Sequence, residues 1–188
     1  SSINYKADSI VATRFQPLVA KVVKNSIVVA QNNYITLDKG TADGIQPGMG
    51  VISPTGIVGI VKGCSEHFSL VTSILHIDPP MRVSSEIRRS GEIGSSRWEV
   101  QNTEIVKLFD VSRYKSVKMG DTIVTSHFNS VFPAGIMVGT VKKLGISSDQ
   151  TFWDIDVKLA TDLRNLSYVY IINNRLQKEQ EQLESTVK

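Results

Sequence analysis

The amino-acid sequence predicts an all-β protein, and three observations support this fold class. First, the 188 residues include 22 Val and 19 Ile but only 11 Leu and 7 Ala, and β-branched side chains pack well on a pleated sheet. Second, apolar and polar residues alternate along several short runs. Third, Gly, Pro and Asp recur between these runs as turn signals. Many short strands with frequent turns are typical of a β-sandwich or β-barrel.

The expected strands begin near Pro17 and continue to about residue 172. Apolar residues occupy alternate positions along them, so one set of side chains faces inward and the other faces water. The pattern is clearest between residues 152 and 159, where apolar and charged residues alternate. The predicted inward positions are Leu18, Ala20, Val22, Ile35, Leu37, Met81, Val83, Ile87, Trp153, Ile155, Val157 and Leu159.

The two ends of the chain lack this pattern. Residues 1–16 are weakly patterned and are predicted to form a linker from an upstream segment. Residues 173–188 are polar, and their two leucines, Leu176 and Leu183, are seven positions apart. Such a thin apolar stripe buries little surface, which favours a solvated tail or a short helix.

A weak internal repeat predicts two related β subdomains. Residues 44–61 read GIQPGMGVISPTGIVGIV, and residues 116–141 read SVKMGDTIVTSHFNSVFPAGIMVGTV. Each copy contains a turn at a glycine, a buried strand, a loop and a second buried strand. The second copy has the longer loop, at residues 127–134. The matched positions are Gly48 with Gly120, Gly56 with Gly135, Gly59 with Gly139, and Val61 with Val141.

Glycines in and around this repeat are expected to be structural turn residues. A glycine permits a positive φ or the close approach of a neighbouring backbone at turns and barrel corners. The glycines given this role are Gly44, Gly48, Gly56, Gly59, Gly120, Gly135 and Gly139.

Composition argues against several classes of function. The formal net charge is only +3, with an isoelectric point near 9.0, and the basic residues form no long block. Nucleic-acid-binding surfaces usually carry a basic stripe, so no nucleic-acid partner is predicted. The single cysteine, Cys64, excludes an internal disulfide. No stretch reaches the roughly 18 apolar residues that a membrane-spanning helix needs.

No pattern of nucleophiles or metal ligands points to catalysis. Cys64 and His67 are three positions apart, but a small cysteine after a strand has an equally good structural explanation. Thr122 stands where a barrel-type serine protease would need its nucleophilic serine, and glycines for an oxyanion hole are absent there. The three histidines are scattered, and Asp154 and Asp156 fit salt-bridged surface acids better than a metal site. We therefore predict no enzyme, metal or cofactor site.

Three apolar residues in the longer loop are the candidate partner-binding residues. Phe128, Val131 and Phe132 lie next to Pro133. Apolar loop residues are either tucked under the loop or used to bind a partner. Because Phe132 and Pro133 directly precede a strand, tucking is a real alternative for this group.

Two ordered sets of motifs resemble the MreC family of rod shape-determining proteins over about residues 17–172. The first set is NYITLDKG at 33–40, DGI at 43–45, GMGVI at 48–52 and GIVGIV at 56–61. The second set is GDTIVTS at 120–126, followed by Phe132-Pro133, Gly135-Ile136 and Gly139. The order and spacing of these fragments carry the resemblance. One departure is His127, where many relatives have glycine.

The resemblance implies a fold of two small six-stranded β-barrel-like subdomains, distantly similar to chymotrypsin-like barrels but without a catalytic triad. The second subdomain is expected at roughly residues 80–150, and both ends of the chain are expected to pack on the first. Residues 1–16 would then be the end of a coiled coil, residues 17–172 the β core and residues 173–188 the polar tail.

The resemblance also implies a non-catalytic scaffold of the bacterial elongasome, which maintains rod shape by binding and regulating the peptidoglycan transpeptidase. The implied partners are the class B penicillin-binding transpeptidase, MreD, RodA and the actin-like MreB, together with self-association. The implied location is the periplasmic face of the inner membrane, with attachment through an N-terminal single-pass anchor outside this sequence.

Two other interpretations remain at this point. One is a β-barrel hydrolase of the protease type, which requires a reactive Ser or Cys close to a His. The other is a generic β module that binds glycan or peptide and has no role in the elongasome.

Overall fold

The computed structural model describes residues 15–27, 31–99 and 102–187. Twelve strands and one α-helix lie in this part of the chain. The strands of the first barrel are β1 (Phe15–Asn25), β2 (Asn32–Leu37), β3 (Gly50–Ile52), β4 (Ile57–Cys64), β5 (Ser69–His76) and β12 (Tyr168–Asn174). Those of the second are β6 (Val83–Ile87), β7 (Ile93–Arg97), β8 (Ile105–Phe109), β9 (Thr122–Thr125), β10 (Met137–Ile146) and β11 (Trp153–Leu159). A 3-10 turn (η1, Thr41–Asp43) precedes β3, and the helix is α2 (Gln177–Ser185).

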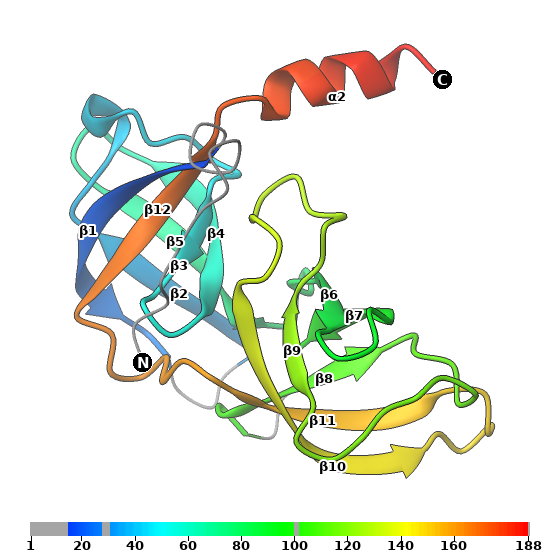
Figure 1. Cartoon of the computed structure of the whole chain (residues 1–188). Coiled ribbons are helices and arrows are strands. Elements are labelled where there is room, and N and C mark those ends of the chain that lie inside the picture. Colours follow the sequence, from blue (N-terminus) through cyan, green and yellow to red (C-terminus); the bar gives the residue numbers. More distant parts are fainter. Residues whose placement is uncertain (1–14, 28–30, 100–101, 188) are drawn as a thin grey trace.

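The strands form two closed antiparallel barrels of six strands each (Figure 1). This confirms the predicted all-β class and the two six-stranded barrels. The alternation of the sequence is also visible in the strands. In β11, for example, Ile155, Val157 and Leu159 are buried, while the residues between them are more accessible. Barrel closure leaves neither sheet with an unpaired edge strand, so the backbone hydrogen bonds of both sheets are satisfied within the chain.

The two barrels have the same strand order around the ring, but their first positions are filled by strands from different places in the sequence. Around barrel 2 the order is β6-β7-β8-β11-β10-β9. Around barrel 1 it is β12-β1-β2-β5-β4-β3. The two rings become identical when β12, the last strand of the chain, takes the place of β6. Barrel 1 is therefore closed by a strand that arrives only after barrel 2 has been completed.

The internal repeat corresponds to equivalent hairpins in the two barrels. The N–H of Gly48 donates a hydrogen bond of 2.8 Å to the carbonyl of Val61. At the matched positions, the N–H of Gly120 donates one of 2.9 Å to the carbonyl of Val141. Both glycines have a left-handed φ, +92° at Gly48 and +80° at Gly120, which residues with a Cβ adopt only with strain.

The seven predicted glycines divide between positions with a positive φ and positions where a neighbouring backbone comes close. Gly59 and Gly139 lie inside β4 and β10, and a Cβ there would overlap the carbonyl oxygen of Thr72 or Lys158 on the neighbouring strand. Gly56 lies in the β3–β4 connection without a positive φ, close to the barrel 2 backbone. These three are therefore close-approach positions, whereas Gly44, Gly48, Gly120 and Gly135 have φ between +80° and +92°.

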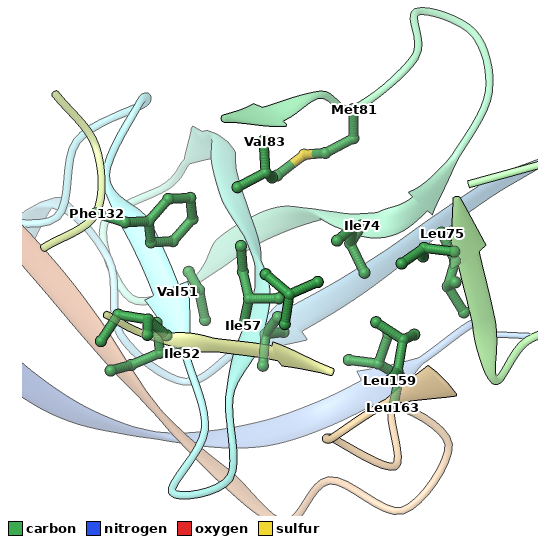
Figure 2. Close-up of a cluster of buried hydrophobic side chains, with 14 of the residues drawn as sticks. Val51, Ile52, Ile57, Ile74, Leu75, Met81, Val83, Phe132, Leu159 and Leu163 are labelled. Atoms are coloured by element: carbon green, nitrogen blue, oxygen red, sulfur yellow. The ribbon is translucent and has the colours of Figure 1, made fainter. Parts of the chain in front are cut away.

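One continuous apolar core joins the two barrels (Figure 2). Val51 and Ile57 of barrel 1, Phe132 of the β9–β10 connection and Leu159 of barrel 2 are all part of it. Polar contacts add to the junction, since the Thr161 hydroxyl lies 3.0 Å from the hydroxyl of Ser53. Because burial of apolar side chains is the main stabilising contribution to folding, this shared core favours a fixed arrangement of the barrels.

The structure revises the element boundaries expected from the sequence. The second barrel runs to Leu159, beyond the expected end near residue 150, because β11 pairs with both β8 and β10. β1 begins at Phe15 and β12 ends at Asn174, so both extend slightly past the expected core of 17–172. Both strands belong to barrel 1. Residues 1–14 of the expected linker lie outside the described residues.

The turn that opens β9 is held by an ion pair. The carboxylate of Asp121 accepts hydrogen bonds from Nε and Nη2 of Arg89, over 2.8 and 2.9 Å. It also accepts one from the backbone N–H of Lys118, over 2.8 Å. The hydrogen bonds from Arg89 lower the pKa of Asp121 below its usual range, against the opposing effect of burial.

We expect Gly120→Val to lower the free energy of unfolding by about 1–3 kcal/mol, because its φ is left-handed. Gly63→Val is the matched control, since Gly63 has no positive φ and a Cβ there meets no atom within 4 Å. The control should stay within about 0.5 kcal/mol of the unmodified chain or be more stable. Urea denaturation measures both, and equal losses would show that backbone strain is not the cause.

We expect Asp121→Asn to destabilise the chain at neutral pH and to destabilise it less in acid. A carboxyl with a lowered folded-state pKa contributes stability above its unfolded-state pKa, and this contribution is lost as pH falls through the folded-state pKa. The difference in unfolding midpoint between the variant and the unmodified chain should therefore shrink below about pH 4. Thermal unfolding from pH 7 to pH 3 measures this, and a pH-independent difference would exclude the ion pair as the cause.

Candidate protein-binding surface

The candidate nucleophiles do not meet the histidines in an active-site arrangement. Cys64 ends β4, and burial raises the pKa of its thiol, which disfavours the reactive thiolate. His67 is exposed beside Glu66, His76 is buried against the ring of Tyr34, and His127 belongs to barrel 2. No hydrogen bond within the described residues joins any of these histidines to Cys64, Ser or Thr. Thr122 simply begins β9.

The acidic residues on β11 belong to a salt-bridge network. Asp154 and Asp156 both contact the ammonium group of Lys107 on β8, over 2.5 and 3.0 Å. Among residues 15–27, 31–99 and 102–187, no three His, Cys, Asp or Glu side chains gather in a way that could hold a metal ion.

The connection from β9 to β10 is held firmly at its base. At Thr125 the backbone N–H donates to the carbonyl of Ile136 over 2.8 Å, and the hydroxyl donates to the carbonyl of Pro133 over 2.6 Å. The N–H of Gly135 donates back to the carbonyl of Thr125 over 2.9 Å. These hydrogen bonds join the two ends of the loop at residues 126–134, so that its ends have little conformational freedom.

Polar side chains fix the loop to both barrels. The side-chain amide of Asn129 donates to the carbonyl of Ser84 in β6, over 2.7 Å. The side-chain amide of Asn174 at the end of β12 donates to the carbonyl of Ser130. In Figure 1 the loop rises between the barrels toward the start of α2. A loop tied on both sides loses little entropy on binding and presents its exposed residues in a fixed place.

The three candidate partner-binding residues of this loop have different environments. Phe132 is 1% exposed and packs beside Gly50 of β3, so the expectation that it faces a partner does not fit and it is removed from that set. Val131 is half-buried against the same core. Phe128 is 68% exposed, and its ring lies 4.0 Å from that of His127. Of the three candidates, Phe128 is therefore the one whose side chain is exposed.

Other exposed apolar residues were not identified from the sequence. On the outer face of barrel 1, Val19 of β1 lies opposite Tyr170 of β12, beside the exposed Val23 and Tyr168. On barrel 2, Tyr114 is 83% exposed in the loop between β8 and β9. The signal for the barrel 1 group was present, because Val19 and Val23 share the outward parity of β1. A period-two pattern alone does not reveal which outward residues come together on neighbouring strands.

A cleft of about 380 Å³ lies between barrel 1 and the start of α2. Pro47 and the buried Met49 form an apolar part of its wall. Asn174, Arg175 and Lys178 contribute polar and basic groups on the other side. Because Asn174 also holds the loop that carries Phe128, the cleft and this loop are neighbours.

The helices in the part of the chain that the structure describes include none with the length and hydropathy needed to cross a membrane. α2 has nine residues, and none of them is buried. The predicted polar tail thus begins with the end of β12 and continues as a short exposed helix.

Comparison with known sequences shows one family. The family model of the barrel core of rod shape-determining protein MreC matches residues 22–173. The cell shape-determining protein MreC of Listeria monocytogenes is 26% identical over 159 residues, which are 84% of this chain and 54% of that protein. The corresponding protein of Bacillus subtilis is 28% identical over 172 residues, covering 85% of this chain and 57% of that protein. The chain thus spans about half the length of these curated relatives.

Comparison with solved structures shows the same double-barrel fold. A structure of MreC from Listeria monocytogenes has a TM-score of 0.77 and 25% identity, covering 85% of this chain and 76% of that chain. A crystal structure of MreC from Pseudomonas aeruginosa has a TM-score of 0.76 and 24% identity, covering 83% and 98%. The complex between penicillin-binding protein PBP2 and MreC from Helicobacter pylori has a TM-score of 0.62 and 16% identity, covering 86% and 99%.

The structure predicts a large loss of stability for one phenylalanine of the loop and almost none for the other. Phe132→Ala should lower the free energy of unfolding by about 3–5 kcal/mol, because it leaves a cavity between the barrels. Phe128→Ala should change it by less than about 0.5 kcal/mol, because Phe128 is exposed.

Urea denaturation of the two variants and the unmodified chain measures this difference. If Phe132→Ala does not fold, Phe132→Leu keeps most of the side-chain volume and should give a smaller loss in the same direction. A comparable loss in Phe128→Ala would mean that this ring is packed rather than presented.

Proposed function

Because this chain belongs to the MreC family of rod shape-determining proteins, we propose that it is a non-catalytic scaffold that binds and regulates a class B penicillin-binding transpeptidase. The observation that carries this proposal is the exposed aromatic ring of Phe128 on a loop fixed to both barrels. Exposed aromatic residues on pre-organised elements are frequent anchors of protein–protein interfaces.

A solved complex supports the choice of partner. The MreC of Helicobacter pylori, which has the same double-barrel fold as this chain, is in complex with the penicillin-binding protein PBP2. That complex concerns a relative that is 16% identical, so the contact residues of this chain have to be established from its own surface. The Phe128 loop is the first surface to test, because it combines exposure with firm anchoring.

A scaffold of this kind acts by preferring one conformation of its partner. If the barrels bind the active conformation of the transpeptidase more tightly than the inactive one, they shift its population toward activity. Raising the active fraction from about one in a hundred to a majority requires roughly 3–5 kcal/mol of preference. An interface of modest size with one or two aromatic anchors supplies free energies of this order.

The proposal places this chain in the elongasome at the periplasmic face of the inner membrane, with an N-terminal anchor outside the sequence. It includes MreD, RodA and MreB as further members of the complex, and it includes self-association. The family membership supports this setting.

We expect Phe128→Ser to weaken binding of the transpeptidase ectodomain at least tenfold, because an interface anchor is lost while the fold stays intact. Biolayer interferometry with immobilised chain measures the affinity. Tyr114→Ser is the matched control, since Tyr114 is also an exposed aromatic residue and lies in a different loop, between β8 and β9. The control should bind like the unmodified chain. Equal affinity of all three proteins would remove the Phe128 loop from the interface.

A further inference from the structure

We propose that the cleft between barrel 1 and α2 binds a carboxylate-bearing peptide segment of the transpeptidase, next to the apolar contact at Phe128. This inference rests on the proposed function and names the chemistry of the partner segment. The cleft has a volume of about 380 Å³, which is large enough for two or three side chains of an extended peptide.

The charges on the cleft favour an anionic occupant. Arg175 and Lys178 line it, and neither has a carboxylate within ion-pair distance among the described residues. The lining also holds one acidic residue, Glu181, whose carboxylate accepts a hydrogen bond of 2.9 Å from the side-chain amide of Gln177. Two cations against one anion leave the lining with a net positive charge. A guanidinium group and an ammonium group that lack protein partners are the groups that bind carboxylates most strongly.

The rest of the lining suits a peptide. Pro47 and Met49 provide an apolar surface at one side of the cleft, and Met49 is only 8% exposed. The side chains of Gln46 and Asn173 add amide groups that can both donate and accept hydrogen bonds. This combination accommodates an acidic residue together with a neighbouring apolar side chain and the peptide backbone between them.

The position of the cleft links it to the proposed interface. Asn174 lines the cleft and donates a hydrogen bond to the carbonyl of Ser130, two residues from Phe128. A partner segment that contacts Phe128 and continues past Ser130 would therefore reach the cleft. The aromatic ring would provide apolar contact. The basic groups would attract the acidic segment and fix its orientation.

The test is a charge reversal. Arg175→Glu with Lys178→Glu should weaken binding of the transpeptidase ectodomain at least tenfold in biolayer interferometry at about 0.1 M salt. Both residues are exposed, so the fold should be retained, which thermal unfolding verifies. The matched control is Lys142→Glu with Lys143→Glu, which makes the same charge change at exposed lysines of β10. The affinity of the unmodified chain should also fall more steeply with salt than that of the cleft variant.

The outcomes separate this inference from the proposed function. If the cleft variant and the lysine control both bind as tightly as the unmodified chain, while Phe128→Ser binds more weakly, the transpeptidase contact stands and the cleft has no part in it. If both charge variants lose affinity equally, general charge attraction is responsible and the cleft proposal is wrong. If the unmodified chain does not bind the ectodomain at high micromolar concentration, both proposals fall.

Discussion

The closure of barrel 1 by the last strand of the chain is the constraint on which the rest of the structure depends. β12 pairs with β1, with Val19 opposite Tyr170, and on its other side with β3, with Tyr170 opposite Ile52. In the sequence, all strands of barrel 2 therefore lie between β5 and β12, two strands of barrel 1. This pairing has a high entropic cost of loop closure, which the shared core and the ladder hydrogen bonds offset. It also fixes where the chain leaves the fold, and thus where α2 and the cleft lie.

The loop between β9 and β10 connects this architecture to the proposed function. Phe132 is buried between the barrels, Asn174 holds the loop from β12, and Asn129 holds it from the side of β6. The same contacts that join the barrels thus determine the direction in which Phe128 faces. A change in the junction would alter the partner-binding surface, even at residues that no partner touches. Stability and the proposed binding would therefore be coupled through this one short segment.

Much of the fold could be predicted from the sequence, because it depends on local signals. Alternation identified the inward residues of β11, and the paired glycines Gly48 and Gly120 indicated equivalent turns with positive φ. The predicted end of barrel 2 was too early. Leu159 belongs to barrel 2 because its strand pairs with β10, and a sequence pattern does not show which strands pair. Phe132 was ambiguous for the same reason, since its burial depends on Gly50, a residue 82 positions earlier in the chain. The cleft combines the turn near Pro47 with residues beyond β12, so no local pattern could have indicated it.

Hydrogen–deuterium exchange of the chain, alone and bound to the transpeptidase ectodomain, tests the central claim most directly. The account predicts that binding slows exchange in the loop at residues 126–131 and at the end of β12 with the start of α2. It predicts no change in the β10–β11 hairpin turn at residues 147–152, which lies on barrel 2 away from this surface. Protection confined to that hairpin or to the outer face of β1, with the 126–131 loop unchanged, would contradict the account.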